Sequence, residues 1–245
     1  MPAASIAIVV PVLDEADVLA ERLAALTPLR DRGVVLVVVD GGSSDGTVAV
    51  AAPLADLVLT APRGRAAQMN AGAAAVERET LLFLHADTAL PADADARIGA
   101  AIARGFRWGR FDVRIDSDRR TLAVVSTAMN WRSHASGIVT GDQALFVQRD
   151  LFDRVGGFPD LPLMEDVALS AILRRHSRPA RIRDVVVTSA RRWEQHGVWR
   201  TIVLMWRLRF EYRLGADPET LARRYGYRAR DAGSAEDKGE GAARL

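Results

Sequence analysis

Side chains that could do chemistry follow several apolar runs of this chain. Asp14 and Asp40 each come at the end of one run, and His85 and Asp87 follow a third. If these runs are parallel strands, their carboxyl ends meet at the edge of the sheet where ligands bind. A carboxylate there could accept hydrogen bonds from a ribose or a base. Asp87 is also a hard oxygen ligand that suits Mg²⁺ or Mn²⁺, and His85 would favour Mn²⁺. Ordinary turn and strand-end roles would use the same residue types.

Two arginines could bind a nucleotide. Arg63 and Arg65 flank Gly64, just ahead of a helix that we expect from residue 66. An arginine near the positive end of a helix can stack on a base or clasp a phosphate with two hydrogen bonds. A solvated basic loop would show the same pattern, so spacing alone leaves both roles open.

Two acidic residues, Glu165 and Asp166, begin a stretch in which apolar residues recur at helical spacing. The helix dipole stabilises negative charge at this end. That effect accounts for the pair fully without a catalytic role.

Runs of strand length alternate with stretches of helical period. The run 34–39 is apolar and mostly β-branched, which suits a strand buried on both faces of a parallel sheet. The run 107–116 alternates polar and apolar residues, which predicts an edge or antiparallel strand. We expect further strands at 6–13, 56–60, 80–84, 144–147 and 180–188, and helices at 16–26, 47–52, 91–104, 122–131, 150–155 and from 165. A polar loop is expected at 132–140, facing an acceptor.

Two of the strand-end motifs resemble those of the family 2 glycosyltransferases. D-G-G-S-S-D-G-T at 40–47 is similar to the family's D-D-G-S-S-D-G-T, with Gly41 where many relatives have a second aspartate. H-A-D-T at 85–88 resembles the D-x-D element, with a histidine in the first position.

Further motifs extend the resemblance along the chain. Asn70 and Gly72 match the family's A-R-N-x-G region, and G-G-F-P-D-L-P-L-M-E-D at 156–166 resembles its G-G-F…E-D element. The motifs follow the family's order over residues 5–200.

The resemblance implies a GT-A fold, an α/β architecture whose mostly parallel sheet has helices on both faces and short antiparallel additions. It also implies inverting transfer of a sugar from a nucleotide-sugar donor, with a UDP-sugar as the leading choice, to an unidentified acceptor. Asp166 would be the general base, next to Glu165, and Asp87 would hold Mn²⁺ or Mg²⁺ against the donor diphosphate. The residues expected to hold the donor are Asp14, Asp40, Arg63, Arg65, Asn70 and His85.

Two other functions remain open. A catalytically silent nucleotide-sugar-binding protein could keep the same fold, and the departures at Gly41 and His85 leave room for it. A sugar nucleotidyltransferase is less well supported, because such enzymes commonly place a lysine in the site and Lys238, in the polar tail, is the sole lysine. Q-H-G-V-W at 195–199 only partly resembles the Q-x-x-R-W motif of processive relatives.

Composition limits the class of protein. We expect one glycosyltransferase domain over 1–228 and a disordered tail over 229–245, where the chain is polar and mixed in charge. A formal net charge of +2 is too small to argue for nucleic-acid binding. The lack of cysteine excludes disulfides and thiolate zinc sites. With no signal peptide and no apolar run of about eighteen residues, we expect a cytoplasmic protein.

The stretch 198–214 predicts an amphipathic C-terminal helix. Its apolar face holds Trp199, Ile202, Val203, Trp206 and Phe210, and its arginines lie largely elsewhere. Such a face could pack on the domain core, on a second subunit in a homodimer, or on a membrane interface. The last alternative would place the protein at the inner face of the membrane.

Overall fold

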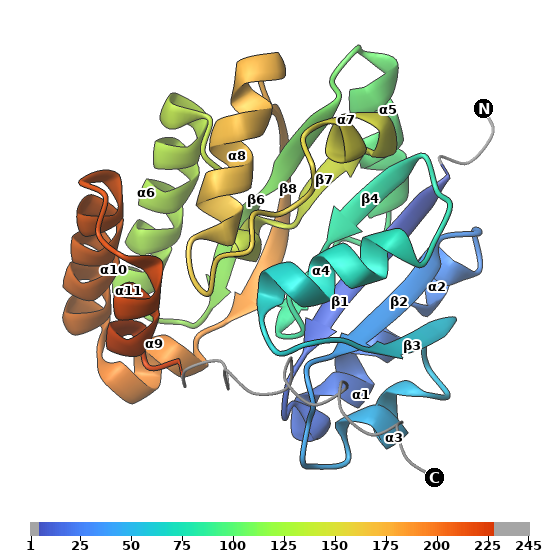
Figure 1. Cartoon of the computed structure of the whole chain (residues 1–245), viewed down its shortest axis with the longest axis horizontal. Helices are drawn as coiled ribbons and strands as arrows, with labels where there is room; N and C mark the ends of the chain where they lie inside the picture. Colours follow the sequence, from blue (N-terminus) through green and yellow to red (C-terminus); the bar gives the residue numbers. More distant parts are fainter. Residues whose placement is uncertain (1–4, 228–245) are drawn as a thin grey trace, which may run out of the picture.

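One sheet of eight strands forms the centre of the computed structural model, which describes residues 5–227 (Figure 1). The strands are β1 (Ile6–Val12), β2 (Val35–Asp40), β3 (Leu57–Thr60), β4 (Thr80–Phe83), β5 (Thr88–Ala89), β6 (Trp108–Asp116), β7 (Leu145–Gln148) and β8 (Ala180–Ser189). Their order is β3-β2-β1-β4-β7-β6-β8-β5. The first four in this order are parallel, and β7 runs antiparallel to β4 and β6. The predicted α/β fold is confirmed, whereas the tail predicted at 229–245 lies outside the described residues.

The side chains of β1 alternate between two cores, although every residue of the strand is buried. Ile6 and Ile8 face one core, and Ala7 and Val9 face the other. This is the expected period of two for a strand that is covered on both sides. The parallel pairing with β2 and β4 brings the carboxyl ends of three strands to one edge.

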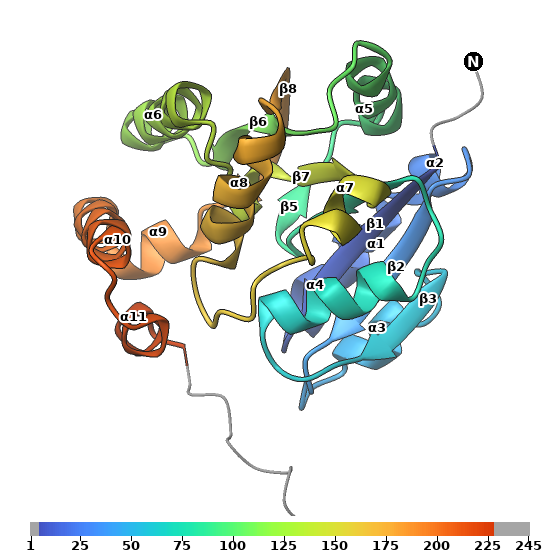
Figure 2. The same ribbon diagram turned by 45° about the horizontal axis from the view of Figure 1, so that its top comes forward.

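Helices cover both faces of the sheet (Figures 1 and 2). They are α1 (Ala16–Ala24), α2 (Thr27–Arg30), α3 (Thr47–Ala51), α4 (Arg65–Ala74), α5 (Ala94–Ala103), α6 (Arg120–Ser136), α7 (Arg149–Arg154), α8 (Glu165–His176), α9 (Arg191–His196), α10 (Val198–Arg213) and α11 (Pro218–Tyr225), with a 3-10 turn η1 (Gly141–Gln143). Helices α1, α2, α3 and α5 pack on one face, and α4, α7 and α8 pack on the other.

Strand β6 meets one of its two predicted alternatives, because it is antiparallel to β7 but is not an edge strand. It lies between β7 and β8, antiparallel to the former and parallel to the latter. Its alternating polar residues, Arg110 and Asp112, are buried as well as its apolar ones. Burial of Arg110 and Asp112 is tolerated because each is paired, whereas Arg114 and Asp116 further along the strand are exposed.

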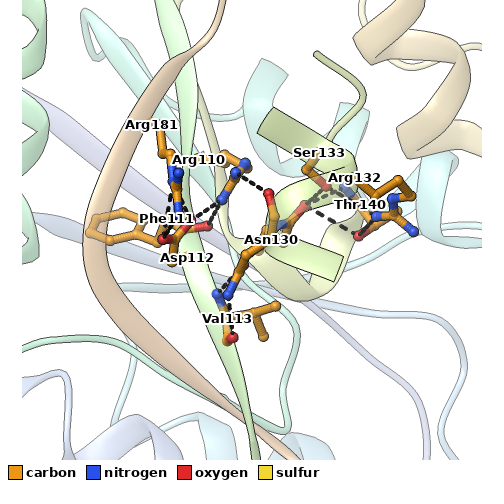
Figure 3. A network of polar contacts seen from close by, with 10 residues as sticks. Arg110, Phe111, Asp112, Val113, Asn130, Arg132, Ser133, Thr140 and Arg181 are labelled. Carbon is orange, nitrogen blue, oxygen red and sulfur yellow. Dashed lines mark hydrogen bonds and ion pairs between the residues drawn. The ribbon is translucent and has the colours of Figure 1, made fainter. Parts of the chain in front are cut away.

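The pairing of these polar residues joins β6 to two neighbouring elements, β8 and α6 (Figure 3). Asp112 accepts hydrogen bonds from Arg110 at 2.5 Å and from Arg181 of β8 at 2.7 Å. Arg110 also donates to the carbonyl oxygen of Asn130 in α6, whose side chain bonds both backbone groups of Val113. This network ties β6 to β8 and α6.

Helix α6 is longer than predicted and takes up most of the expected polar loop. It continues through Ser136 and ends at Gly137, whose φ of 68° is the left-handed conformation that glycine favours at a helix end. The connection to η1 is therefore confined to 137–140.

The C-terminal helices form a small separate cluster beside α8. Gly197, with φ of 80°, separates α9 from α10. Leu208 of α10 and Leu221 of α11 pack with Leu163 and Met164, in the loop that leads into α8. The wall built by α10 and α11 therefore stands next to the first turn of α8.

The apolar face predicted for 198–214 does not pack on the core. Trp199, Val203, Trp206 and Phe210 are 63–74% exposed, whereas Leu208, on the opposite side of α10, is fully buried. Along residues 5–227, no helix is both long enough and apolar enough to cross a membrane.

Candidate functional site

A cleft of about 520 Å³ opens at the carboxyl ends of β1 and β4, a volume in the usual range for small-molecule sites. Its walls come from the ends of these strands, the start of α4, η1, the start of α8 and helices α9–α11. The site residues expected from the sequence that line it are Arg63, Arg65, His85, Asp87, Glu165 and Asp166.

Asp166 lies in the first turn of α8 and faces this cleft. Its Oδ2 accepts a hydrogen bond from the backbone N–H of Gly141 at 2.7 Å, and its Oδ1 accepts one from that of Val167 at 2.7 Å. Burial raises the pKa of Asp166, while these two bonds and the nearby Arg65 and Arg132 oppose the rise. The result is a fixed carboxylate that holds a proton more readily than an exposed aspartate.

Arg65 brings positive charge to the same part of the cleft. Burial disfavours its charge, but Tyr227, Glu165 and Asp166 outweigh this effect and raise its pKa. Its guanidinium carbon lies 5.6 Å from the ring centroid of Tyr227. Arg65 therefore stays cationic at the start of α4, where the helix dipole also attracts an anion.

His85 packs edge-on against Gly141. A Cβ added to Gly141 would come within 2.3 Å of His85 Nε2, so this backbone approach requires glycine. Burial lowers the pKa of His85 well below its ordinary value, and the charge of Arg65 lowers it further. The imidazole is therefore neutral and can offer a lone pair or one N–H.

Asp142, which lines the cleft, and Arg132, whose charge acts on Asp142 and Asp166, are not among the residues predicted from the sequence. Asp142 lines the cleft and accepts a hydrogen bond from Thr140 Oγ1 at 2.5 Å. Burial raises the pKa of Asp142, and the charges of Asp166 and Asp87 add to the rise. Arg132 has a buried Nε with no hydrogen-bond partner within the described part of the chain. The G-D-Q sequence of η1 was the available signal for Asp142, whereas Arg132 falls where a loop was expected.

The carboxylate of Asp87 and the imidazole of His85 are the side chains best suited to a divalent cation. Among residues 5–227, no group of three or more histidines and acids could hold a metal by itself. Mg²⁺ commonly binds through one or two carboxylates and completes its shell with substrate phosphates and water. The residues present therefore fit a cation that arrives with a diphosphate, but not a cation held by protein alone.

Three predicted site residues, Asp14, Asp40 and Asn70, do not line the cleft. The carboxylate of Asp40 is buried and accepts hydrogen bonds from the N–H groups of Gly42 and Ser43. Asp14 accepts one from the N–H of Ser44. Their ligand-binding roles stay predictions.

Asn70 joins two motifs that are distant in the sequence. Its Nδ2 donates to the carbonyl oxygen of Phe158 at 2.8 Å, and its Oδ1 accepts from the N–H of Phe158 at 2.9 Å. Asn70 therefore fastens the G-G-F turn to α4, and its predicted contact with a donor is not tested by this geometry.

The side chain of Gln68 lies next to position 41 and explains why this position is a glycine. The Nε2 of Gln68 donates to the carbonyl oxygens of Val12 and Val39, each at 2.8 Å, at the ends of β1 and β2. A Cβ on Gly41 would lie 3.1 Å from this amide. Gln68 thus occupies space that a side chain at position 41 would need.

Aromatic side chains of the C-terminal cluster complete the cleft. The guanidinium carbon of Arg192 lies 3.6 Å from the ring centroid of Tyr225, a close cation–π contact. Burial raises the pKa of Tyr227 to about 12, so its hydroxyl stays protonated. Tyr225 belongs to α11 and Tyr227 follows it, so the end of the described chain contributes to the lining of the cleft.

The family model for glycosyl transferase family 2 matches residues 7–148, more than half of the chain. No curated protein matches the chain.

Several solved structures share the fold. The mannosyltransferase PcManGT from Pyrobaculum calidifontis, in complex with GDP-Man and Mn²⁺, has a TM-score of 0.59 and 23% identity, covering 84% of this chain and 60% of that one. Glucosyl-3-phosphoglycerate synthase from Mycobacterium tuberculosis, with Mn²⁺, UDP and glucosyl-3-phosphoglycerate, has a TM-score of 0.58 and 16% identity, covering 74% and 70%. TarS 1–349 from S. aureus, in complex with UDP, has a TM-score of 0.63 and 17% identity, covering 75% and 60%. The chain thus spans about 60% of the length of two of these three structures.

Proposed function

Because the chain belongs to glycosyl transferase family 2, we propose that it transfers a sugar from a nucleotide-sugar donor to an acceptor hydroxyl with inversion, using Asp166 as the general base. The observation that carries this proposal is the state of Asp166. Its carboxylate faces the cleft, is fixed by two backbone N–H groups and has a pKa raised by burial. A base whose pKa lies closer to the working pH accepts a proton more effectively in the transition state.

The reaction is a single displacement at the anomeric carbon. The acceptor oxygen forms a bond to this carbon as its proton passes to Asp166, and the bond from the carbon to the donor phosphate oxygen breaks. The electron pair of that bond leaves with the nucleoside diphosphate. Attack from the side opposite the leaving group inverts the configuration.

The leaving diphosphate gains negative charge, and the arginines at the start of α4 can stabilise it. Arg65 remains cationic at this helix N-terminus, and Arg63 also lines the cleft. His85, being neutral, can orient a phosphate or hold a ligand without adding charge.

Asp87 would hold a divalent cation that arrives with the donor. His85, two residues earlier in the chain, would be a further ligand. Structures that share this fold contain Mn²⁺ with GDP-Man, or Mg²⁺ with UDP, which supports a metal-dependent donor site. When bound, such a cation neutralises part of the charge that develops on the diphosphate. UDP is the expected nucleotide, and GDP-sugars are the alternative because one of these relatives holds GDP-Man.

The proposal treats residues 1–228 as one catalytic domain. Its support is that α10 and α11 share a cleft with the part of the chain that the family model matches, since Met205 and Tyr225 line the same cavity as Asp87. We further propose a cytoplasmic location for this enzyme.

The test is a screen of purified protein against UDP- and GDP-sugars with Mn²⁺, reading nucleoside diphosphate release. Asp166→Asn keeps the size of the side chain but removes its basicity, so we expect turnover to fall by about 10²–10⁴-fold while donor binding persists. Donor binding is read from the rise in melting temperature that a ligand of the native state produces. Asp153→Asn, at an exposed carboxylate of α7, is the matched control.

Near-normal turnover in Asp166→Asn would contradict the assignment of the base. Donor binding without turnover by the wild-type protein, across all donors, would instead favour the catalytically silent binding protein.

A further inference from the structure

The outer side of α10 carries a continuous line of large apolar side chains that nothing in residues 5–227 covers. The residues of this outer stripe, with their exposed fractions, are Trp199 (73%), Val203 (64%), Trp206 (74%), Phe210 (63%) and Leu214 (72%). They recur every three or four residues, so they share one face of the helix. Single exposed apolar residues are normal, but a contiguous line marks an interaction surface.

The outer stripe is additional to the face by which α10 packs on the protein. That inner face includes Leu208, which is fully buried against Leu163 and Met164. An amphipathic helix of a globular protein needs only such an inner face. The second apolar face therefore has no role in the folding of the described chain.

Helix α6 lies beside α10 and exposes two further large side chains. Val198 of α10 packs against the buried cluster that includes Leu122 of α6, and the views in Figures 1 and 2 agree on the neighbouring positions of the two helices. Val124 and Trp131 of α6 are 68% and 71% exposed. The neighbouring helix therefore also exposes large apolar side chains.

Positive charge borders the outer stripe on both sides. At 100° per residue, exposed Arg200 falls on one flank of the stripe and exposed Arg213 on the other, while Arg207, on the flank of Arg200, is neutralised by an ion pair. The one acidic residue within α10, Glu211, already pairs with Arg207 at 2.7 Å and with Arg224 at 2.6 Å. Helix α6 contains no acidic residue. The surface is therefore apolar with a basic border.

We propose that α10 docks on the surface of an anionic lipid bilayer, with the outer stripe at the boundary between head groups and acyl chains. Tryptophan favours this boundary because its ring is apolar and its N–H is polar. Arginine at the flanks can extend to anionic head groups while its methylene groups stay near the apolar layer. The charge pattern selects this partner over a second copy of the chain, since a two-fold dimer through the stripe would bring the basic borders together.

The consequence for the cleft follows from the width of one helix. The inner side of α10 contributes Thr201, Met205 and Arg209 to the cleft, and an α-helix with its side chains is about 10–12 Å across. Docking through the outer stripe therefore holds this wall of the cleft within about one helix diameter of the lipid head groups.

The test is co-sedimentation of the full chain with vesicles of phosphatidylglycerol and phosphatidylcholine in equal parts, beside vesicles of phosphatidylcholine alone. We expect binding to the anionic vesicles at low salt and weaker binding at high salt, because salt screens the head-group charge. Trp199→Ser/Trp206→Ser should lower the partition coefficient by about tenfold or more, since two large apolar side chains no longer enter the interface. Val48→Ser/Val185→Ser, at two residues that are each 41% exposed outside α10, should leave it unchanged.

A second pair of variants tests the basic border. Arg200→Gln/Arg213→Gln should lower the partition coefficient by about fivefold for each arginine, the effect of one basic residue near an anionic surface. The matched control is Arg175→Gln/Arg178→Gln, at exposed arginines at and just after the end of α8. Vesicles with brominated acyl chains should quench the tryptophan fluorescence of the wild-type protein, which gives a readout that needs no variant.

No binding to anionic vesicles at low salt would overturn the proposal. So would equal loss in the test and control variants, or a dimer that Trp199→Ser/Trp206→Ser dissociates while no vesicles are bound. Thermal unfolding is the check on folding, and unchanged melting temperatures are expected because the substituted side chains are exposed.

Discussion

Removing the carboxylate of Asp112 should destabilise the protein far more than removing an exposed one. The side chain of Asp112 is 10% exposed, and that of its partner Arg110 is 2% exposed. The side chain of Arg181, the second partner, is 32% exposed and can still reach water. In Asp112→Ala, the charge of Arg110 would remain buried without a counter-charge.

The size of this effect follows from burial. Breaking a buried ion pair by removing one partner costs about 3–5 kcal/mol of unfolding free energy. We expect about 3 kcal/mol, because Arg110 keeps its hydrogen bonds to the carbonyl oxygens of Phe111 and Asn130. For a domain of this size that is a fall in melting temperature of about 6–12 °C.

The assay is urea and thermal unfolding, with Asp150→Ala as the matched control. Asp150 also pairs with an arginine, Arg107, but its side chain is 62% exposed. Exposed pairs contribute less than about 1 kcal/mol. The double variant Arg110→Met/Asp112→Leu should lose less stability than Asp112→Ala, since it leaves no buried charge unpaired.

The pH dependence supplies an independent check. Burial alone would raise the pKa of Asp112, but the hydrogen bonds from Arg181 and Arg110 outweigh it and lower that pKa below the ordinary value. The stabilisation by this carboxylate is therefore complete above the ordinary aspartate range and is lost only as the pH falls through the lowered pKa. The difference between wild type and Asp112→Ala should stay constant from pH 7 to about pH 5. A cost no larger than that of Asp150→Ala would refute the reasoning.

Three further predictions concern the cleft. Asp87→Ala should weaken binding of a nucleoside diphosphate, measured by calorimetry, much more with Mn²⁺ than with a chelator. The acid limb of kcat/KM for donor turnover should lie above the ordinary aspartate range, because burial raises the pKa of Asp166 and the base must be ionised. Arg132→Gln should move this limb to higher pH, since the charge of Arg132 lowers that pKa. Gly141→Ala should cost about 1–3 kcal/mol in unfolding free energy and reduce turnover, because its Cβ would meet His85 at 2.3 Å.

Each of these has an outcome that would contradict it. Equal weakening by Asp87→Ala with and without Mn²⁺ would remove the metal from the site. An acid limb that does not respond to Arg132→Gln would separate it from Asp166. For position 141, Gly46→Ala is the control, since its Cβ would approach no atom closer than 4.0 Å, and equal stability of both variants would contradict the packing argument.

The positions of the strands along the chain, and the place of Asp166 in the first turn of a helix, were open to prediction because each depends on a short, local pattern. About a dozen residues are enough to recognise a buried strand followed by a polar turn. The same holds for an acidic pair at a helix start. The burial of Arg110 and Asp112 could not be predicted in this way, because it depends on Arg181 and Asn130, which are distant in the sequence. The pattern of alternation was correct, but it could not tell a paired polar side from a solvated one.

The same reasoning explains the C-terminal helix. Helical period identified an apolar face at Trp199 and Trp206, but α10 has a second apolar side that includes Leu208. Periodicity describes how residues are distributed around a helix and contains no information on which side meets the core. Asp142 was overlooked for a related reason, since its importance arises from contacts with Thr140 and from the charges of carboxylates on other elements.

The contact between Gly41 and Gln68 has a consequence for the evolution of this chain. The amide of Gln68 cannot retreat from position 41 without giving up its bonds to the ends of β1 and β2. A second aspartate at position 41 would therefore displace this amide, and a shorter side chain at position 68 would relieve the contact. We therefore expect the two positions to covary among related sequences, although position 68 lies in a helix 27 positions further along the chain.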